Sequence, residues 1–417
     1  MKRYLIIQLA RFGDLVQTKR LLHSLLSAGD AEVHLCIDGS LEELARLVYP
    51  EAKVHAIVAH GAGAPASLAA VLGRNGRVFS VLASLHFDEV YNLNYSGLSF
   101  ALSRLFPPET VRGYVSDAGQ DLKDSWTAMA FRWMRHRRAG SINLADFWAN
   151  LAPKPLAPQN VNPLAAPKGR GLGIVLAGRN QRRSLPPRVL ADVAQTVAAS
   201  RGLSRLALLG GKGELPMARE VLAALRPGVA AHVENLCGRT DWRDLTEEVS
   251  GLDLLLTPDT GTMHLAAHLG TPVLAFFLSS AWCPETGPYG LGHTVWQAVP
   301  PCAPCLESAP CGLGLTCLSA FSAPEFLRLL AGKGEGLGLA VTGLRSAFDE
   351  LGSTWEPFHA DLPSASERER FRRFLKRHLG LNADFAADAD LAEQFYLERD
   401  WIGLERKTCK RNFKAYV

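Results

Sequence analysis

Residues 256–272, LTPDTGTMHLAAHLGTP, combine residue types that can bind a charged ligand where a strand passes into a helix. An apolar run ends at Asp259, and Gly261 stands where the helix would begin. The first backbone amides of a helix have no intrahelical acceptor, and the helix dipole makes this end partly positive. Such an end attracts phosphate, and Gly261 has no side chain to hold a phosphate away from the backbone. The stretch therefore predicts a phosphate site at the amides of Gly261, Thr262 and Met263.

Two titratable side chains border these amides, and each allows two interpretations. Asp259 would repel phosphate, so it either binds a sugar hydroxyl or caps the helix. His264 lies in the first helical turn, where it would donate to a phosphate oxygen or form a structural hydrogen bond.

A second junction, LARFGDLVQT at residues 9–18, repeats the same order of strand, short loop and helix. The helix is expected from Leu15, with Asp14 at its start. A carboxylate at the positive end of a helix stays ionised, so Asp14 would serve as a helix cap or as a weak general base. The junction lacks GxGxxG, and the chain contains no GxxxxGK[ST], which weakens the dinucleotide-fold and P-loop interpretations.

The elements that must position these residues alternate between apolar strands and helices. Such βα repetition predicts doubly wound parallel sheets. We expect strands at 4–10, 32–38, 53–58, 89–96, 171–178, 203–211, 253–259 and 272–279, and helices near 186–200, 214–226, 241–251 and 261–269. The proline-rich stretch 152–170 is predicted to be a linker between two domains. The predicted organisation is an N-terminal domain over 1–151, this linker, a second domain over 171–334, and a helical extension over 335–417.

Length and composition set the class of protein. A chain of 417 residues can form two domains, each with its own core. With 47% hydrophobic residues and a net charge of only +4, the composition is globular and does not suggest a nucleic-acid partner. Arg11 and Asp14 interrupt the apolar N-terminal run early, so we expect a cytoplasmic protein.

At these junctions the chain resembles glycosyltransferase family 9, which contains the ADP-heptose:lipopolysaccharide heptosyltransferases. The resemblance is carried by LIIQLARFGDLVQTKRLLHSL, TPDTGTMHLAAHLGTPVLAFF and ETGPYG, and it spans most of residues 1–330. It implies a GT-B fold, with two Rossmann-like domains facing across a cleft and the nucleotide-sugar held mainly by the second. It also implies inversion at the sugar without a metal ion or other cofactor.

The resemblance assigns roles residue by residue. Asp14 takes the general-base position, and Asp259, Thr260, Gly261 and His264 contact the diphosphate and the sugar, with Thr262 among the donor-binding residues. Glu214, in GGKGE, binds the adenosine ribose.

The stretch RNQRRSLPP at 179–187 departs from the family. The family commonly has a lysine three residues before the proline, and here Arg183 holds that spacing before Pro186, with Arg182 beside it. A guanidinium binds a diphosphate too, although through a planar fork of donors.

The acceptor would meet the first domain. The cationic groups of Arg11, Lys19 and Arg20, with Gly13 beside Asp14, suit a lipopolysaccharide core or another lipid-linked saccharide that carries negative charge. The basic segment 131–140, FRWMRHRRAG, is either a solvated helix face or a surface for the acceptor. Trp133 would then lie against sugar or lipid, and the same segment would rest on the inner face of the cytoplasmic membrane.

Four of the eight cysteines lie close together. Cys302, Cys305, Cys311 and Cys317 form the pattern C-x₂-C-x₅-C-x₅-C. They would hold a structural zinc or iron, or pack as reduced thiols, and we prefer the thiols because only the first spacing suits a metal knuckle.

Other functions remain open at this stage. One is a nucleotide-sugar epimerase on the same architecture, which would convert the donor without an acceptor. A protein-directed heptosyltransferase and a binding protein that has lost catalysis are further alternatives. The intact Asp14 and Asp259 junctions favour a transferase.

Overall fold

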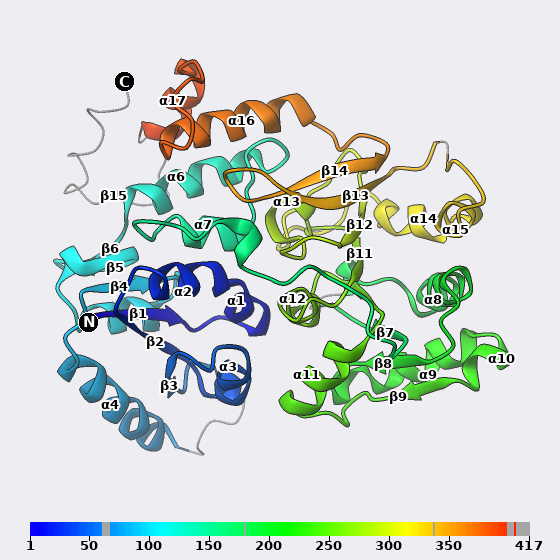
Figure 1. The fold of residues 1–417 in the computed structure, drawn as a ribbon, viewed down its shortest axis with the longest axis horizontal. Helices are drawn as coiled ribbons and strands as arrows, with labels where there is room; N and C mark the ends of the chain where they lie inside the picture. The colour runs from blue at the N-terminus through cyan, green and yellow to red at the C-terminus, as the bar shows by residue number, and fades with distance from the viewer. Residues whose placement is uncertain (61–66, 179–180, 337, 398–403, 406–417) are drawn as a thin grey trace. The chain divides into compact units, whose positions relative to one another are not determined.

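The computed structural model describes residues 1–417 except 61–66, 179–180, 337, 398–403 and 406–417. The chain forms two compact units, each containing one sheet (Figure 1). The first unit contains Met1–Val161 and Ser366–Val417, and the second contains Asn162–Ala365. The chain thus leaves the first unit inside the stretch 152–170 and returns to it near its C-terminus.

The sheet of the first unit has the strand order β15-β6-β5-β4-β1-β2-β3. Strands β1 to β5 run parallel, and β6 is antiparallel to β5. Parallel sheets are covered on both faces, and Leu5, Ile6 and Ile7 of β1 are accordingly buried in an unbroken apolar run. The strands are β1 (Lys2–Gln8), β2 (Ala31–Asp38), β3 (Lys53–Ile57), β4 (Glu89–Asn92), β5 (Val111–Asp117), β6 (Gln120–Lys123) and β15 (Leu404–Glu405).

The helices of the first unit lie between these strands and in the C-terminal part of the chain. They are α1 (Phe12–Gln17), α2 (Lys19–Leu26), α3 (Glu42–Val48), α4 (Leu68–Ser84), α5 (Gly97–Ser103), α6 (Ser125–Trp133), α7 (Leu144–Ala149), α16 (Ala365–His378) and α17 (Ala389–Tyr396). Several have side-chain caps, such as Asp124, which accepts from the Thr127 amide at the start of α6.

The second unit has a sheet with the order β14-β13-β12-β11-β10-β7-β8-β9. Strands β7 to β12 are parallel, whereas β13 and β14 add an antiparallel pair at one edge. The strands are β7 (Leu172–Val175), β8 (Leu206–Leu209), β9 (Val233–Asn235), β10 (Leu254–Pro258), β11 (Val273–Phe277), β12 (Thr294–Ala298), β13 (Val341–Phe348) and β14 (Ser353–His359).

The helices of the second unit are α8 (Pro187–Arg201), α9 (Leu215–Ala224), α10 (Pro227–Ala230), α11 (Trp242–Gly251), α12 (Gly261–His268), α13 (Cys283–Thr286), α14 (Thr316–Ser322) and α15 (Pro324–Leu330). Four of them, α8, α9, α11 and α12, lie close to the expected positions, and the other four were not expected. Helix α8 begins with Pro187 at its first position and ends at Gly202 with φ +65°, the left-handed conformation that glycine adopts without strain.

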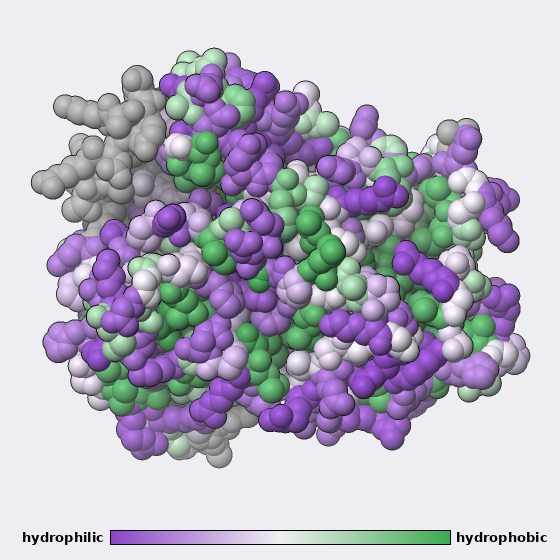
Figure 2. Space-filling view, viewed as in Figure 1, coloured by the Kyte–Doolittle hydropathy of each residue, from purple (hydrophilic) through white to green (hydrophobic). Residues whose placement is uncertain are grey.

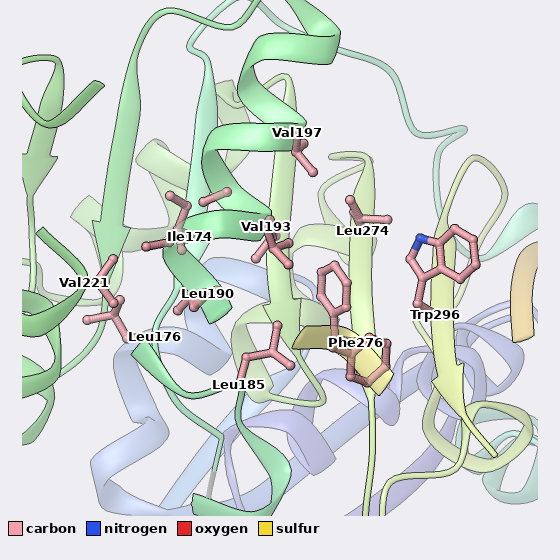
Figure 3. Packing of buried hydrophobic residues seen from close by; sticks show 14 of the residues in the cluster. Ile174, Leu176, Leu185, Leu190, Val193, Val197, Val221, Leu274, Phe276 and Trp296 are labelled. Carbon is pink, nitrogen blue, oxygen red and sulfur yellow. The ribbon is translucent and has the colours of Figure 1, made fainter. Parts of the chain in front are cut away.

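A large core cluster fixes the parallel strands of the second unit. In Figure 3, Leu190, Val193 and Val197 of α8 lie over the sheet together with Ile174 of β7 and Phe276 of β11. These residues are almost completely buried. Strands β7, β10 and β11 pair within this core, so the loops at their carboxyl ends start from fixed points.

The C-terminal region differs from the uniform helical extension expected from the sequence. Residues 341–359 form β13 and β14, which extend the second sheet. Helices α16 and α17 occur where charged amphipathic helices were expected, and they belong to the first unit. Among the described residues, no helix is long and apolar enough to cross a membrane.

Candidate functional site

In each sheet the strand order reverses at one strand. The loops that follow this strand and its neighbours contain the residues that the sequence analysis singled out. Strand β1 lies between β2 and β4, and β7 lies between β8 and β10. In open α/β sheets, ligands bind at the carboxyl ends of strands at such switch points. Asp14 follows β1, Arg183 follows β7, and Asp259 follows β10.

In the second unit, the amino end of α12 is capped by Thr260. Its Oγ1 accepts from the Met263 amide at 3.3 Å and lies 3.0 Å from Thr257 Oγ1. The interpretation of Asp259 as the helix cap is therefore wrong. Gly261 and Thr262 are partly exposed at the first two helical positions, where amides have no intrahelical acceptor. For the predicted phosphate site this leaves the amides of Gly261 and Thr262, because the Met263 amide already donates to Thr260.

Asp259 instead forms a buried network. Its Oδ2 pairs with the Arg183 guanidinium and accepts from Thr286 Oγ1 at 2.9 Å. The Nε2 atom of His264 is 3.8 Å from Asp259 Oδ1, too far for a hydrogen bond. Burial raises the pKa of Asp259, while Arg183 and Thr286 act in the opposite direction. With 7% of its surface exposed, this carboxylate mainly holds its protein partners.

The two neighbouring arginines have different partners. Arg183 donates from Nη2 to the Asp259 carboxylate, and its Nε is buried without a hydrogen-bond partner among the described residues. Arg182 donates from Nη1 to the Ala309 carbonyl at 2.6 Å, which ties it to the cysteine-rich segment. A buried N–H without an acceptor is uncommon in folded proteins. The Nε of Arg182 is likewise buried without a hydrogen-bond partner among the described residues, so the two arginines differ only in the partners of their Nη atoms. Arg183 is the one that pairs with Asp259, next to the first turn of α12.

Glu214 lies at the carboxyl end of β8, in a short turn over Lys212–Glu214. Its Oε2 accepts from the Gly211 amide at 2.7 Å, and its side chain is partly buried. This contact fixes one end of the carboxylate. Strand β8 pairs with β7, so Glu214 and Arg183 follow neighbouring strands.

Thr286 is a residue of this network that the sequence analysis did not single out. It lies in the ETGPYG stretch, which was recognised only as part of the family resemblance. Helix α13 places it beside Asp259, and no local pattern reveals that contact because 27 positions separate the two residues.

In the first unit, Asp14 is partly exposed at the third position of α1. Its Oδ2 accepts from the Arg11 amide at 3.1 Å, so its carboxylate closes a capping box. The helix begins at Phe12, three residues earlier than expected, because this box covers the first turn. The Asp14 side chain is thus held in place by this hydrogen bond to one of its carboxylate oxygens. Gly13 lies next to it and accepts from Gln17 Nε2 at 3.2 Å.

The residues expected to bind the acceptor differ in exposure: Arg11 and Lys19 are at least partly exposed, whereas Arg20 is buried. Arg11 is exposed, and burial lowers the pKa of Lys19 to about 8. Arg20 is buried, with Nη1 2.5 Å from Asp146 Oδ1 and Nε bonded to the Leu156 carbonyl at 2.9 Å. Its assignment to the acceptor is wrong, because these partners use the guanidinium to join α2 to α7.

Trp133 also corrects an expectation. It is 4% exposed and packs edge-on against Trp126, Phe147 and Phe371, so it does not lie against sugar or lipid. The basic segment 131–140 therefore uses Trp133 to anchor itself in the first unit, and its exposed residues begin at Met134.

The four clustered cysteines are free thiols in the second unit. The Cys305 amide donates to the Ser279 carbonyl at 3.0 Å, and burial raises the pKa of the Cys305 thiol. Cys311 Sγ accepts from the Leu315 amide at 3.4 Å. No group of three or more metal-binding side chains is arranged around a common point in the described part of the chain. Whether Cys302, Cys305, Cys311 and Cys317 hold a metal stays a prediction.

Together these features define an α/β protein with two Rossmann-like units, the second presenting helix amides and a guanidinium at a switch point. Residues 173–311 match the model of "Glycosyltransferase family 9 (heptosyltransferase)". The match covers about a third of the chain, and within that segment it agrees with the resemblance that the sequence indicated. The matched segment contains Arg183, Glu214 and the α12 junction.

Comparison with solved structures supports the same fold. The structure of ADP-heptose lipopolysaccharide heptosyltransferase II from E. coli is 17% identical, with a TM-score of 0.52, covering 71% of this chain and 90% of that one. The E. coli heptosyltransferase WaaC with ADP is 16% identical, with a TM-score of 0.54, covering 72% and 93%. These likenesses confirm the predicted GT-B class of fold.

Similarity to a curated protein is short. A stretch of 43 residues is 42% identical to the lipopolysaccharide core heptosyltransferase OpsX of Haemophilus influenzae, covering 10% of this chain and 12% of that protein. The matched stretch therefore represents only about an eighth of the length of that relative.

Proposed function

We propose that this protein is an inverting glycosyltransferase that moves a sugar from an ADP-sugar to a saccharide acceptor. The preferred sugar is heptose, and the preferred acceptor is lipopolysaccharide core or a related lipid-linked saccharide. The main observation that supports this proposal is the network of Arg183, Asp259 and Thr286 beside the amino end of α12. This network lies within the segment that matches the family model.

The proposed diphosphate site consists of the Gly261 and Thr262 amides and the Arg183 guanidinium, since the Met263 amide donates to Thr260 Oγ1. The unpartnered Nε of Arg183 supports this assignment, because a phosphate oxygen would supply its missing acceptor. Negative charge accumulates on the ADP as the glycosidic bond breaks. Donors already fixed at that position stabilise the transition state more than the ground state.

In this proposal, Asp259 acts through Arg183. Its buried carboxylate holds the guanidinium with help from Thr286, so the arginine does not have to be ordered when the donor binds. Glu214 binds the ribose with the carboxylate oxygen that does not accept from Gly211. His264 and Thr262 complete the donor site at the first turn of α12.

Asp14 is the proposed general base for the acceptor hydroxyl. A weak base is sufficient if proton transfer is late, because the attacking oxygen becomes acidic as it bonds to the oxocarbenium-like carbon. The partial exposure of Asp14 leaves its carboxylate accessible. One carboxylate acting as a base, without a second one as nucleophile, gives a single displacement with inversion.

The acceptor proposal includes a peripheral contact with the membrane that carries the lipid-linked saccharide. Arg11 and Arg135 are exposed cations, which suit phosphorylated or carboxylated saccharides and anionic lipid. Location in the cytoplasm stays a prediction.

The test is a panel of ADP- and UDP-sugars, each with and without core oligosaccharide, with products identified by mass spectrometry. We expect a glycosylated product only when ADP-heptose and the oligosaccharide are both present, with or without EDTA. Conversion of the donor without an acceptor would favour an epimerase. Loss of product in EDTA that added Mg²⁺ restores would contradict metal-independent transfer.

The role of Asp14 gives the first prediction. Asp14→Asn is expected to bind ADP normally but to lower transfer by about 10²–10⁴-fold, because the amide cannot take the acceptor proton. Asp244→Asn is a matched control, since Asp244 occupies the same capping-box position in α11 and accepts from the Asp241 amide. Equal transfer rates in the two variants would reduce Asp14 to a helix cap.

A further inference from the structure

The loop that follows β4 is joined to the end of β1. Asn94 Nδ2 donates to Gln8 Oε1 at 2.8 Å, and Asn94 Oδ1 accepts from the Leu9 amide. Strands β1 and β4 are parallel neighbours, so the loops that follow them leave the same edge of the sheet. Asp14, which follows β1, and the loop after β4 thus belong to one connected edge of the first unit.

Tyr95 extends from this loop to the surface, where it is 57% exposed. Every other phenylalanine, tyrosine and tryptophan among the described residues of the first unit is buried or half-buried. An aromatic ring removes a large apolar area from water when a ligand covers it. An exposed ring at the edge where ligands bind to such sheets is therefore a candidate contact for a ligand.

Four side chains from four different elements hold the ring of Tyr95. Phe100 of α5 and Tyr114 of β5 pack edge-on against it, each with 5.4 Å between ring centroids, and Phe131 of α6 is tilted against it at 5.7 Å. Lys123 of β6 places its Nζ over the ring, 5.3 Å from the centroid. All of these except the half-buried Phe131 are buried, so they hold the ring from the protein side. A ring that is already ordered loses little conformational freedom when a ligand binds.

The surface around Tyr95 suits a small ligand with one apolar face. The exposed residues that follow it, Ser96 and Gly97, have no apolar side chain, whereas a bilayer or a protein partner needs a contiguous apolar patch. On the face of the molecule seen in Figure 2, the first unit has its hydrophobic residues in small groups among hydrophilic ones. A sugar ring needs only one aromatic ring for its apolar contact.

We propose that Tyr95 binds the saccharide acceptor by stacking against one of its sugar rings. This choice of ligand rests on the proposed function, which brings an acceptor hydroxyl to Asp14 at the same edge. The C–H groups on one face of a sugar ring pack against the aromatic face, and the hydroxyls at the rim keep their hydrogen bonds to water. Because the ring makes this contact, the Tyr95 hydroxyl is not required for it.

The test measures transfer from ADP-heptose while the concentration of core oligosaccharide is varied. Tyr95→Leu removes the ring but keeps an apolar side chain, and it should raise the KM for the oligosaccharide about tenfold with little change in kcat. Tyr95→Phe keeps the ring and should behave as the wild type. The matched control is Phe358→Leu in the second unit, since Phe358 is also an exposed ring, with the Arg345 guanidinium 4.9 Å from its centroid. Its KM should equal that of the wild type.

Isothermal titration calorimetry with the oligosaccharide alone separates binding from catalysis. Tyr95→Leu should weaken this binding about tenfold, and Tyr95→Phe should not. Equal affinities of Tyr95→Leu and the wild type, equal losses in both Tyr95 variants, or no binding to the wild type would overturn the proposal. If the oligosaccharide binds through Tyr95 but receives no sugar, the proposed function fails and the stacking contact does not. If sugar is transferred with the same KM in Tyr95→Leu, only the stacking contact fails.

Discussion

Arg182 and Arg183 show that residue types alone predict the charge of a loop but not which of its side chains binds a ligand. The sequence indicates that the loop before Pro186 is cationic, but Arg182 and Arg183 are chemically identical there. Their partners distinguish them, since Arg183 reaches the buried Asp259 and Arg182 reaches a backbone carbonyl 127 positions away. Tertiary contacts of this separation leave no local trace, which is why Thr286 also went unnoticed.

Arg183→Lys should retain the fold but weaken ADP binding by about tenfold or more, since an ammonium cannot keep its bond to Asp259 and also supply the forked donors for a diphosphate. Arg182→Lys is the neighbouring control and should change ADP affinity little. Isothermal titration calorimetry with ADP measures both. The opposite ranking would assign the phosphate to Arg182.

At the scale of elements, the parallel strands and the α12 junction could be predicted, and the edges of the sheets could not. Buried strands such as β1 and β10 are continuous apolar runs between turn signals, a strong local pattern. Strands β13 and β14 contain exposed charged and polar positions and Gly343, so their pattern is weak. Pairing with β12 decides their structure, and this depends on tertiary contacts.

The junction of α2 and α7 is stabilised by a buried ion pair, and it gives a prediction about stability. Asp146→Ala would leave the Arg20 guanidinium buried without its carboxylate, at a cost of roughly 3–5 kcal/mol. Glu42→Ala is the control, because its pair with Arg46 is exposed and such pairs contribute about 0–1 kcal/mol. Urea unfolding measures the difference. Similar midpoints for the two variants would contradict a structural role for Arg20.

Across the whole molecule, the half-buried His55 and the buried His293 link stability to pH. Burial lowers the pKa of His55 to about 4 in the first unit and that of His293 to about 3 in the second. A histidine in the unfolded chain titrates near 6.5. As pH falls below that value, the unfolded state binds protons that the folded state does not, so both units lose stability on acidification.

His293 allows the sharpest test of this linkage. Its side chain is 1% exposed at the start of β12, and neither ring nitrogen has a hydrogen-bond partner within the described residues. As the pH falls below about 6.5, His293 should lower the free energy of unfolding by roughly 1.4 kcal/mol per pH unit. This loss ends as the pH approaches its folded-state pKa of about 3. His293→Leu removes the titrating group and keeps a side chain of similar size.

Urea unfolding of the wild type and of His293→Leu from about pH 7 to about pH 5 measures this effect. The variant should become increasingly more stable than the wild type as the pH falls, with a small difference at neutral pH. His232→Leu, which removes an exposed histidine from the same unit, should follow the wild type throughout. If the difference between His293→Leu and the wild type stays constant with pH, His293 takes up a proton equally in the folded and unfolded states.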